Sequence, residues 1–140
     1  MQTHLDIFAS NIEKVREMLK IISIRFGWTD EHRAYSALLA VLHTLRDTFP
    51  IEQAIGFGND LPVLIRGFYY EGWKPSENRE RLSKEDFISR VEEFVMPYPE
   101  EETEDIIKAV CMALLDSIAP DEVARLKTIL PPYINTLLSN

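Results

Sequence analysis

The segment from Leu61 to Pro75 carries the side chains of this chain that are best suited to recognising another molecule. It places one arginine, two tyrosines and one tryptophan around two glycines, so flat apolar surfaces and polar tips follow one another closely. Side chains of this kind dominate binding surfaces because they bury a large area and still form hydrogen bonds. The binding residues predicted from this pattern are Arg66, Tyr69, Tyr70 and Trp73, with His43 as a further candidate.

Arg66 has more than one kind of partner open to it. It can stack on a neighbouring ring or bind a carboxylate, for which Asp47 and Glu71 are the candidates. A structural interpretation stands beside the functional one: Tyr69 and Trp73 would cover the seam between two halves of the fold. In that case Arg66 would satisfy carbonyl groups at the end of a helix. The sequence leaves both interpretations open.

The three histidines do not form a metal-binding pattern. No two of His4, His32 and His43 are one helical turn apart, and neither Glu-x-x-His nor His-Glu-x-x-His occurs. We therefore expect no metal and no other cofactor. His43 precedes Asp47 by one helical turn, which predicts a half-buried ring held by that carboxylate. A role as a ligand or in proton transfer is the alternative.

Nucleophilic catalysis finds little support in the sequence. Cys111 lies on an apolar helical stripe between Val110 and Met112, which indicates a buried structural thiol rather than a reactive one. No Gly-x-Ser-x-Gly turn occurs, and Gly56–Gly58 lacks the further glycines and the lysine of a phosphate-binding loop. We expect no catalytic residues, and an enzyme is the least favoured class of function.

Helical periodicity governs nearly the whole chain. A second helix is predicted to start near Thr29, and Pro50 opens a short third helix that Gly58 ends. Asp60 would cap a fourth helix with Pro62 in its first turn, where the missing amide is tolerated. The first helix carries an apolar stripe with spacings of three and four residues. This stripe comprises Leu5, Phe8, Ile12, Val15, Leu19, Ile22 and Phe26.

The order of helices and prolines occurs twice along the chain. Arg33–Tyr69 and Glu104–Leu138 share an apolar helix, a proline, a short acidic helix, a Leu-Pro pair and a second apolar helix. The matching prolines lie 70 residues apart at the first position and 69 at the second (120 − 50 and 131 − 62). A repeat of this kind indicates one supersecondary unit used twice.

We therefore predict an all-α, compact helical bundle with no sheet, forming one domain over residues 1–140. Two tandem repeats at about 3–72 and 83–138 would be joined by a polar connector at 73–82. Ser83 would cap the first helix of the second repeat, and Pro97 and Pro99 would follow its end. Two repeats are too few to cap an open solenoid, so we expect them to share one core.

Charge and length restrict the classes of partner. The net charge of −8 opposes binding to phosphate backbones and to anionic lipids, so we expect neither nucleic acid nor a membrane as partner. No apolar run approaches the roughly 20 residues of a membrane-spanning helix, and the start of the chain has no secretory pattern. The single cysteine excludes an internal disulfide. These features together predict a cytoplasmic protein.

Several short stretches are distinctive as a combination: Gly27-Trp28, Arg33-Ala34-Tyr35, Ala40–His43, Leu45–Asp47, Leu61-Pro62, Arg66-Gly67 and Tyr69–Trp73. Through them, nearly the whole chain resembles the bacterial proteins of the domain of unknown function 2267 family. The resemblance implies an all-helical duplicated fold in a bacterial cytoplasmic setting, and it implies no reaction. Two positions depart from the pattern. Leu39 replaces an expected basic residue, which argues against a basic groove, and Asp60 replaces the usual glutamine before Leu-Pro.

These observations favour a non-enzymatic interaction protein, which could be a homodimer, with Arg66, Tyr70 and Trp73 as its binding surface. The second half of the chain lacks this set, so folding of one repeat does not require it. The alternative is that a small acidic ligand binds in a cleft between the two repeats. Arg66 and His43 would then supply the polar contacts within an otherwise apolar pocket.

Overall fold

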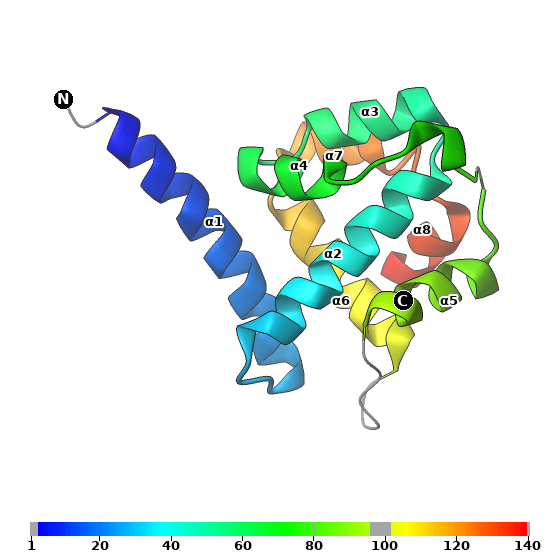
Figure 1. The fold of residues 1–140 in the computed structure, drawn as a ribbon, viewed down its shortest axis with the longest axis horizontal. Coiled ribbons are helices and arrows are strands. Elements are labelled where there is room, and N and C mark those ends of the chain that lie inside the picture. Colours follow the sequence, from blue (N-terminus) through cyan, green and yellow to red (C-terminus); the bar gives the residue numbers. More distant parts are fainter. Residues whose placement is uncertain (1–2, 80, 96–101, 140) are drawn as a thin grey trace.

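A computed structural model describes residues 3–79, 81–95 and 102–139, and within these ranges the chain forms eight α-helices and no strand (Figure 1). The all-α prediction is therefore confirmed. Pro97 and Pro99 lie outside the described residues. The helices are α1 (Thr3–Phe26), α2 (Glu31–Thr48), α3 (Ile51–Asn59), α4 (Val63–Tyr70), α5 (Lys84–Phe94), α6 (Thr103–Asp116), α7 (Pro120–Leu126) and α8 (Pro132–Ser139), with a 3-10 turn at Pro75–Glu77.

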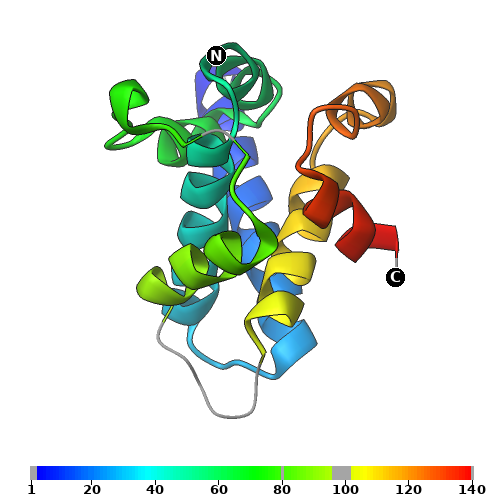
Figure 2. The same ribbon diagram turned by 90° about the vertical axis from the view of Figure 1, so that its right-hand side faces the viewer.

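Helix α2 lies at the centre of the fold and contacts α1, α3, α4, α5 and α6. Helix α6 runs beside it, with α3 and α4 on one side of this pair and α7 and α8 on the other (Figure 2). The buried apolar side chains of the described residues form one cluster that draws on both halves of the chain. Helix α2 and the residue after it bury an apolar stripe in this cluster, formed by Ala34, Leu38, Val41, Leu42, Leu45 and Phe49.

Several helix ends follow from local sequence signals. The Asp30 carboxylate accepts a hydrogen bond from the amide of His32 at 2.9 Å, so α2 begins slightly later than the predicted start near Thr29. The Ser83 hydroxyl accepts from the amide of Asp86 at 3.1 Å, which confirms the predicted cap of α5. Gly72 follows α4 with a φ of 70°, a conformation that glycine adopts without strain.

The predicted start of α4 was wrong in its details. Pro62 has an extended ψ of 151° and stands just before Val63, the first helical residue, rather than inside the first turn. Asp60 follows the last turn of α3 instead of capping α4, and its carboxylate forms an ion pair with Arg125 of α7. Gly58 does not end α3, because the helix continues through Asn59.

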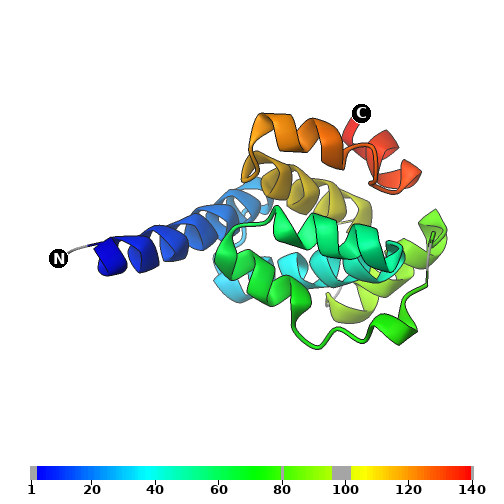
Figure 3. The same cartoon turned by 90° about the horizontal axis from the view of Figure 1, so that it is seen from above.

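The first half of α1 extends beyond the rest of the molecule (Figures 1 and 3). Among the described side chains of its apolar stripe, Leu19 and Ile22 are the buried ones, where the helix reaches the body. Farther out, the side chains of Phe8 and Ile12 are 63% and 49% exposed. The periodicity thus predicted the helix correctly, but no other helix in the described ranges covers Phe8 and Ile12. Among the described residues, no helix combines the length and the apolar character that crossing a bilayer requires.

Candidate functional site

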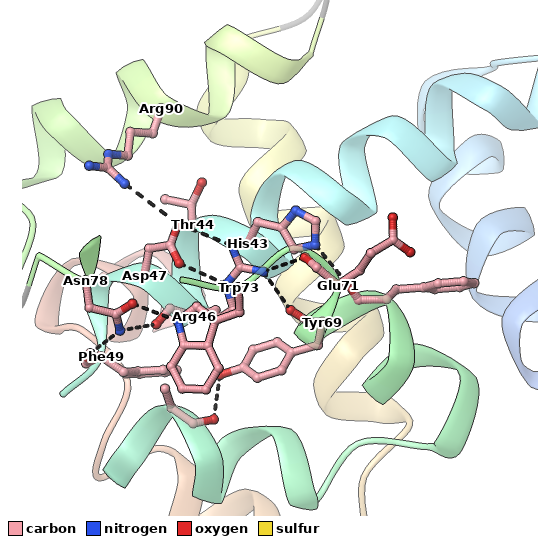
Figure 4. Close-up of polar contacts among 12 residues, drawn as sticks. His43, Thr44, Arg46, Asp47, Phe49, Tyr69, Glu71, Trp73, Asn78 and Arg90 are labelled. Carbon is pink, nitrogen blue, oxygen red and sulfur yellow. Dashed lines mark hydrogen bonds and ion pairs between the residues drawn. The ribbon is translucent and has the colours of Figure 1, made fainter. Parts of the chain in front are cut away.

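The predicted binding residues lie around a buried arginine that the sequence analysis did not single out. Arg46 of α2 is 6% exposed, and its Nη1 donates to the carbonyl oxygens of Tyr69 and Glu71, both at 3.0 Å. Its Nε donates to Asp47 Oδ1 at 2.8 Å. The two carbonyls belong to the carboxyl end of α4, where the helix dipole favours a cation. Arg46 therefore fastens α4 to α2 (Figure 4).

Asp47 extends this contact to a third helix. Its Oδ2 lies 3.8 Å from Nη1 of Arg90 on α5, while Oδ1 is engaged by Arg46. A carboxylate shared by two guanidinium groups lowers the cost of keeping Arg46 charged away from water. The three side chains join α2, α4 and α5 at one point (Figure 4).

His43 is half-buried, as predicted, but its partner is different. Nε2 lies 2.7 Å from the carbonyl oxygen of Phe68 on α4. Because a carbonyl can only accept, Nε2 carries the ring proton. The prediction that Asp47 holds this ring was wrong, since that carboxylate pairs with Arg46 and Arg90 instead.

The two tyrosines connect α4 to α3. Tyr69 is fully buried, and its hydroxyl donates to the carbonyl oxygen of Ala54 at 2.6 Å. The hydroxyl of Tyr70 donates to the carbonyl oxygen of Ile55 at 3.0 Å. Burial raises the pKa of both phenols above the ordinary value, although the nearby Arg66 partly opposes this for Tyr70. Both groups are therefore protonated donors over the physiological pH range.

Arg66 donates hydrogen bonds to carbonyl groups at the carboxyl end of α3. Its Nη2 donates to the carbonyl oxygens of Asn59 and Leu61, both at 3.1 Å. The two carboxylates that were candidate partners of Arg66, Asp47 and Glu71, do not fill this role. The geometry instead matches the structural interpretation, in which the guanidinium group satisfies a helix end.

Trp73 is tied to the connector through Asn78. The indole Nε1 donates to Asn78 Oδ1 at 2.7 Å. The amide Nδ2 of Asn78 in turn donates to the carbonyl oxygens of Arg46 and Phe49, both at 3.0 Å, at the carboxyl end of α2. The Trp73 ring also packs against Tyr70, with centroids 5.8 Å apart. Asn78 was missed by the sequence analysis because it lies in a polar segment without periodicity.

The polar groups of these side chains form hydrogen bonds within the chain. Each of His43, Tyr69, Tyr70 and Arg66 directs at least one polar atom at a backbone carbonyl of another element. Trp73 does the same through Asn78. Donors that are already engaged can contact a ligand only after an internal bond is broken. The geometry thus favours a structural role for this set, and its role in binding remains a prediction.

The described residues offer few candidate groups for nucleophilic catalysis or metal binding. Cys111 is buried, and burial raises the pKa of its thiol to about 12, so the reactive thiolate is scarce at neutral pH. Within residues 3–79, 81–95 and 102–139, no three His, Cys, Asp or Glu side chains lie close enough together to hold a metal ion.

Comparison with known protein families identifies a match to this chain. A family model described as "Uncharacterized conserved protein (DUF2267)" matches residues 15–137. None of the curated proteins matches the chain. The match includes every residue of the site described above and begins in the middle of α1, so the outer part of that helix lies before the shared region.

Proposed function

We propose that this chain, which belongs to the DUF2267 family, is a non-enzymatic protein that associates with a second copy of itself through the outer part of α1. The contact surface is the pair Phe8 and Ile12, which we call the α1 ridge. The observation that carries the proposal is the exposure of this ridge at the end of a stripe whose inner members, Leu19 and Ile22, are buried.

The α1 ridge has a physical reason to be covered. An exposed phenylalanine or isoleucine gains roughly 1.5–3 kcal/mol when it is fully buried. Phe8 and Ile12 lie one helical turn apart, so they form one continuous apolar surface on the same side of α1. The charged residues Asp6, Glu13 and Lys14 lie on other sides of the helix, which leaves the surface suited to another apolar helix.

A second copy of the same helix fits this surface. If two α1 helices pack antiparallel with their centres at the height of Ser10, Phe8 of each chain meets Ile12 of the other. The contact is then self-complementary about a two-fold axis, as in most homodimers. Ala9 and Asn11 flank the crossing point and carry no charge, so no like charges are brought together there.

The expected affinity is modest. Two apolar side chains from each chain cover far less than the roughly 1,200 Å² of total surface that stable interfaces bury. The net charge of −8 also makes two copies repel each other, and salt screens that repulsion. We therefore expect association in the micromolar range or weaker, and stronger association at higher ionic strength.

Sedimentation equilibrium over a range of concentrations tests the proposal. The wild type should associate, and the double variant Phe8→Ser/Ile12→Ser should remain monomeric with an unchanged melting temperature. Ile21→Ser/Ile24→Ser is the matched control, because these side chains are 55% and 68% exposed on the same helix. At about 100° per residue they lie far around the axis from the α1 ridge. A ridge variant that associates like the wild type would refute the proposal.

We place the surface on α1 rather than on Arg66, Tyr70 and Trp73 because Nη2 of Arg66, the hydroxyl of Tyr70 and the indole N–H of Trp73 already have partners within the chain. The ridge residues, in contrast, would contribute new contacts without breaking existing ones. This choice also separates the two roles along the sequence. The region matched by the family model would build the fold, and the segment before it would make the contact.

We also propose that the two halves of the chain are copies of one unit, as the spacing of the prolines predicts. The order of one long and two short helices supports this, since it holds for α2, α3 and α4 and again for α6, α7 and α8. Pro50 precedes α3 and Pro120 begins α7. An experimental structure in which α2 and α3 cross at a different angle from α6 and α7 would contradict the duplication.

A further inference from the structure

A hollow of about 450 Å³ separates the two halves of the chain at the end opposite the tip of α1. Its walls are the α2–α3 corner from Thr48 to Gln53 and the α7–α8 link from Thr128 to Pro132. Arg81 and Leu82 of the connector close a third side. The volume lies within the range of about 300–1,000 Å³ that small-molecule sites occupy. Neither Arg66 nor His43, which we expected to line such a cleft, belongs to its walls.

Arg81 adopts an unusual backbone conformation at the rim of this hollow. Its φ is 60°, which disfavours any residue with a Cβ atom by roughly 1 kcal/mol. Two hydrogen bonds hold the conformation: the amide of Arg81 donates to the carbonyl oxygen of Thr48 at 3.0 Å, and the amide of Leu82 donates to Thr48 Oγ1 at 2.9 Å. Strained residues other than glycine concentrate at functional sites, where their side chains must be held in place.

The walls combine one charge with a mostly apolar lining. Among the described residues that line the hollow, Arg81 is the one with a charged side chain. Apolar surface comes from Phe49, Leu82, Ile129 and Leu130, and three prolines add rigid walls. We propose that this hollow binds a small organic monocarboxylate, with the carboxylate on the Arg81 guanidinium group and an apolar body between the two halves.

The chemistry of the walls selects this class of ligand. A guanidinium group binds a carboxylate through two parallel hydrogen bonds, which neither a neutral ligand nor a cation can accept in the same way. A simple inorganic anion would leave the apolar walls exposed to water and would gain nothing from them. The site is independent of the α1 ridge, so failure of either proposal leaves the other standing.

Isothermal titration calorimetry with octanoate, benzoate, acetate and inorganic phosphate tests the site. Octanoate or benzoate should bind with a dissociation constant below about 1 mM, while acetate and phosphate should bind at least tenfold more weakly. Absence of binding by both apolar carboxylates, or equal binding of acetate or phosphate, would overturn the proposal.

Two variants separate the site from general effects on the fold. Arg81→Gly removes the guanidinium group and also relieves the left-handed backbone, so the protein should stay folded while affinity falls at least tenfold. Gln53→Trp should narrow the hollow and weaken binding even though Arg81 remains. Arg79→Gln is the control, since its side chain is exposed and lies outside the walls. Unchanged affinity in Arg81→Gly, or in Gln53→Trp, would also overturn the proposal.

Discussion

The ring of Tyr70 occupies the space that a side chain at position Gly58 would need. A Cβ atom added to Gly58 would lie 2.6 Å from Tyr70 Cζ and 2.7 Å from Tyr69 Cε2. Because Tyr69 is buried and hydrogen-bonded to Ala54, it has little freedom to move away. Glycine is required here for space and not for its backbone freedom, which explains why it lies inside α3 rather than at its end.

Gly58→Ala should therefore destabilise the protein by about 1–3 kcal/mol, the usual range for overpacking. Gly67→Ala is the matched control, because a Cβ atom at this helical position of α4 would meet no atom within 4 Å. It should stabilise the protein by roughly 0.5–1 kcal/mol. Urea denaturation measures both. Equal effects of the two substitutions would show that the Tyr69 and Tyr70 rings do not restrict position 58.

Arg46→Met should be among the most destabilising single substitutions. It removes a buried guanidinium group and leaves the Tyr69 and Glu71 carbonyls and the Asp47 carboxylate short of their donors. Loss of one partner from a buried ion pair costs about 3–5 kcal/mol, and we expect the lower end because Asp47 is 25% exposed and keeps Arg90.

Chemical denaturation of Arg46→Met should be compared with Arg79→Gln, whose exposed side chain predicts a change within about 0.5 kcal/mol. Similar free energies of unfolding for these two variants would contradict the structural role assigned to Arg46. The near-ultraviolet circular dichroism spectrum of Arg46→Met should also differ from that of the wild type. The substitution removes the hydrogen bond to the backbone carbonyl of Tyr69 and so changes the environment of the Tyr69 ring.

Stability should fall as the pH rises above about 8, and Cys111 should account for the first part of the loss. Burial raises its thiol pKa from 9.0 to about 12, so between these values the unfolded chain releases a proton that the folded chain keeps. The free energy of unfolding should then drop by up to about 1.4 kcal/mol per pH unit.

Cys111→Ala should remove most of this slope between pH 8 and pH 9, where an unfolded thiol with its ordinary pKa of 9.0 already titrates and unfolded tyrosines, whose ordinary pKa is 10.0, contribute little. The substitution also leaves a small cavity at every pH, so the slope rather than the absolute free energy is the quantity to compare. An identical slope in the variant would show that the thiol is not the titrating group.

The Asp60–Arg125 ion pair should contribute less than about 1 kcal/mol, because Arg125 is 56% exposed. It joins the carboxyl end of α3 to α7 and so connects the two halves of the chain. A double-mutant cycle with Asp60→Asn and Arg125→Gln gives the coupling energy, which should shrink as salt is added. A coupling that is insensitive to salt would contradict the surface character of this pair.

Local signals in the sequence predicted most of the helices. Pro50 and Ser83 act within their own turns, so the starts of α3 and α5 followed directly. Pro62 misled the prediction because proline suits both the first turn of a helix and the residue before it. The extended ψ of 151° at Pro62 itself distinguishes the two cases, and residue type alone does not fix that angle.

The site was harder to predict because its partners are distant along the chain. His43 was assigned to Asp47 by helical spacing, but Phe68 on another helix offers a carbonyl at 2.7 Å. Arg46 could have been noticed, since it stands between Leu45 and Phe49 on the buried side of α2, where a charge requires a partner. Asn78 gave no comparable signal.

The exposure of apolar side chains could not be predicted from periodicity either. A spacing of three and four residues shows that Phe8 and Ile12 share one side of a helix, but it cannot show whether anything lies opposite that side. The same holds for Phe94 at the end of α5, which continues the spacing of Phe87 and Val91 and is 59% exposed. Coverage depends on the length of a helix relative to the body that it packs against.

The position of the core along α1 has an evolutionary consequence. Among the described side chains, the first that packs against the core is Val15 and the first that is buried is Met18, so substitutions at Phe8 and Ile12, nearer the tip, change no packing inside the body. If the tip makes the proposed contact, substitutions there can change the partner without a cost to folding, and a tip grafted from a related chain should carry its own specificity. On that proposal, recognition and folding depend on different stretches of the same helix.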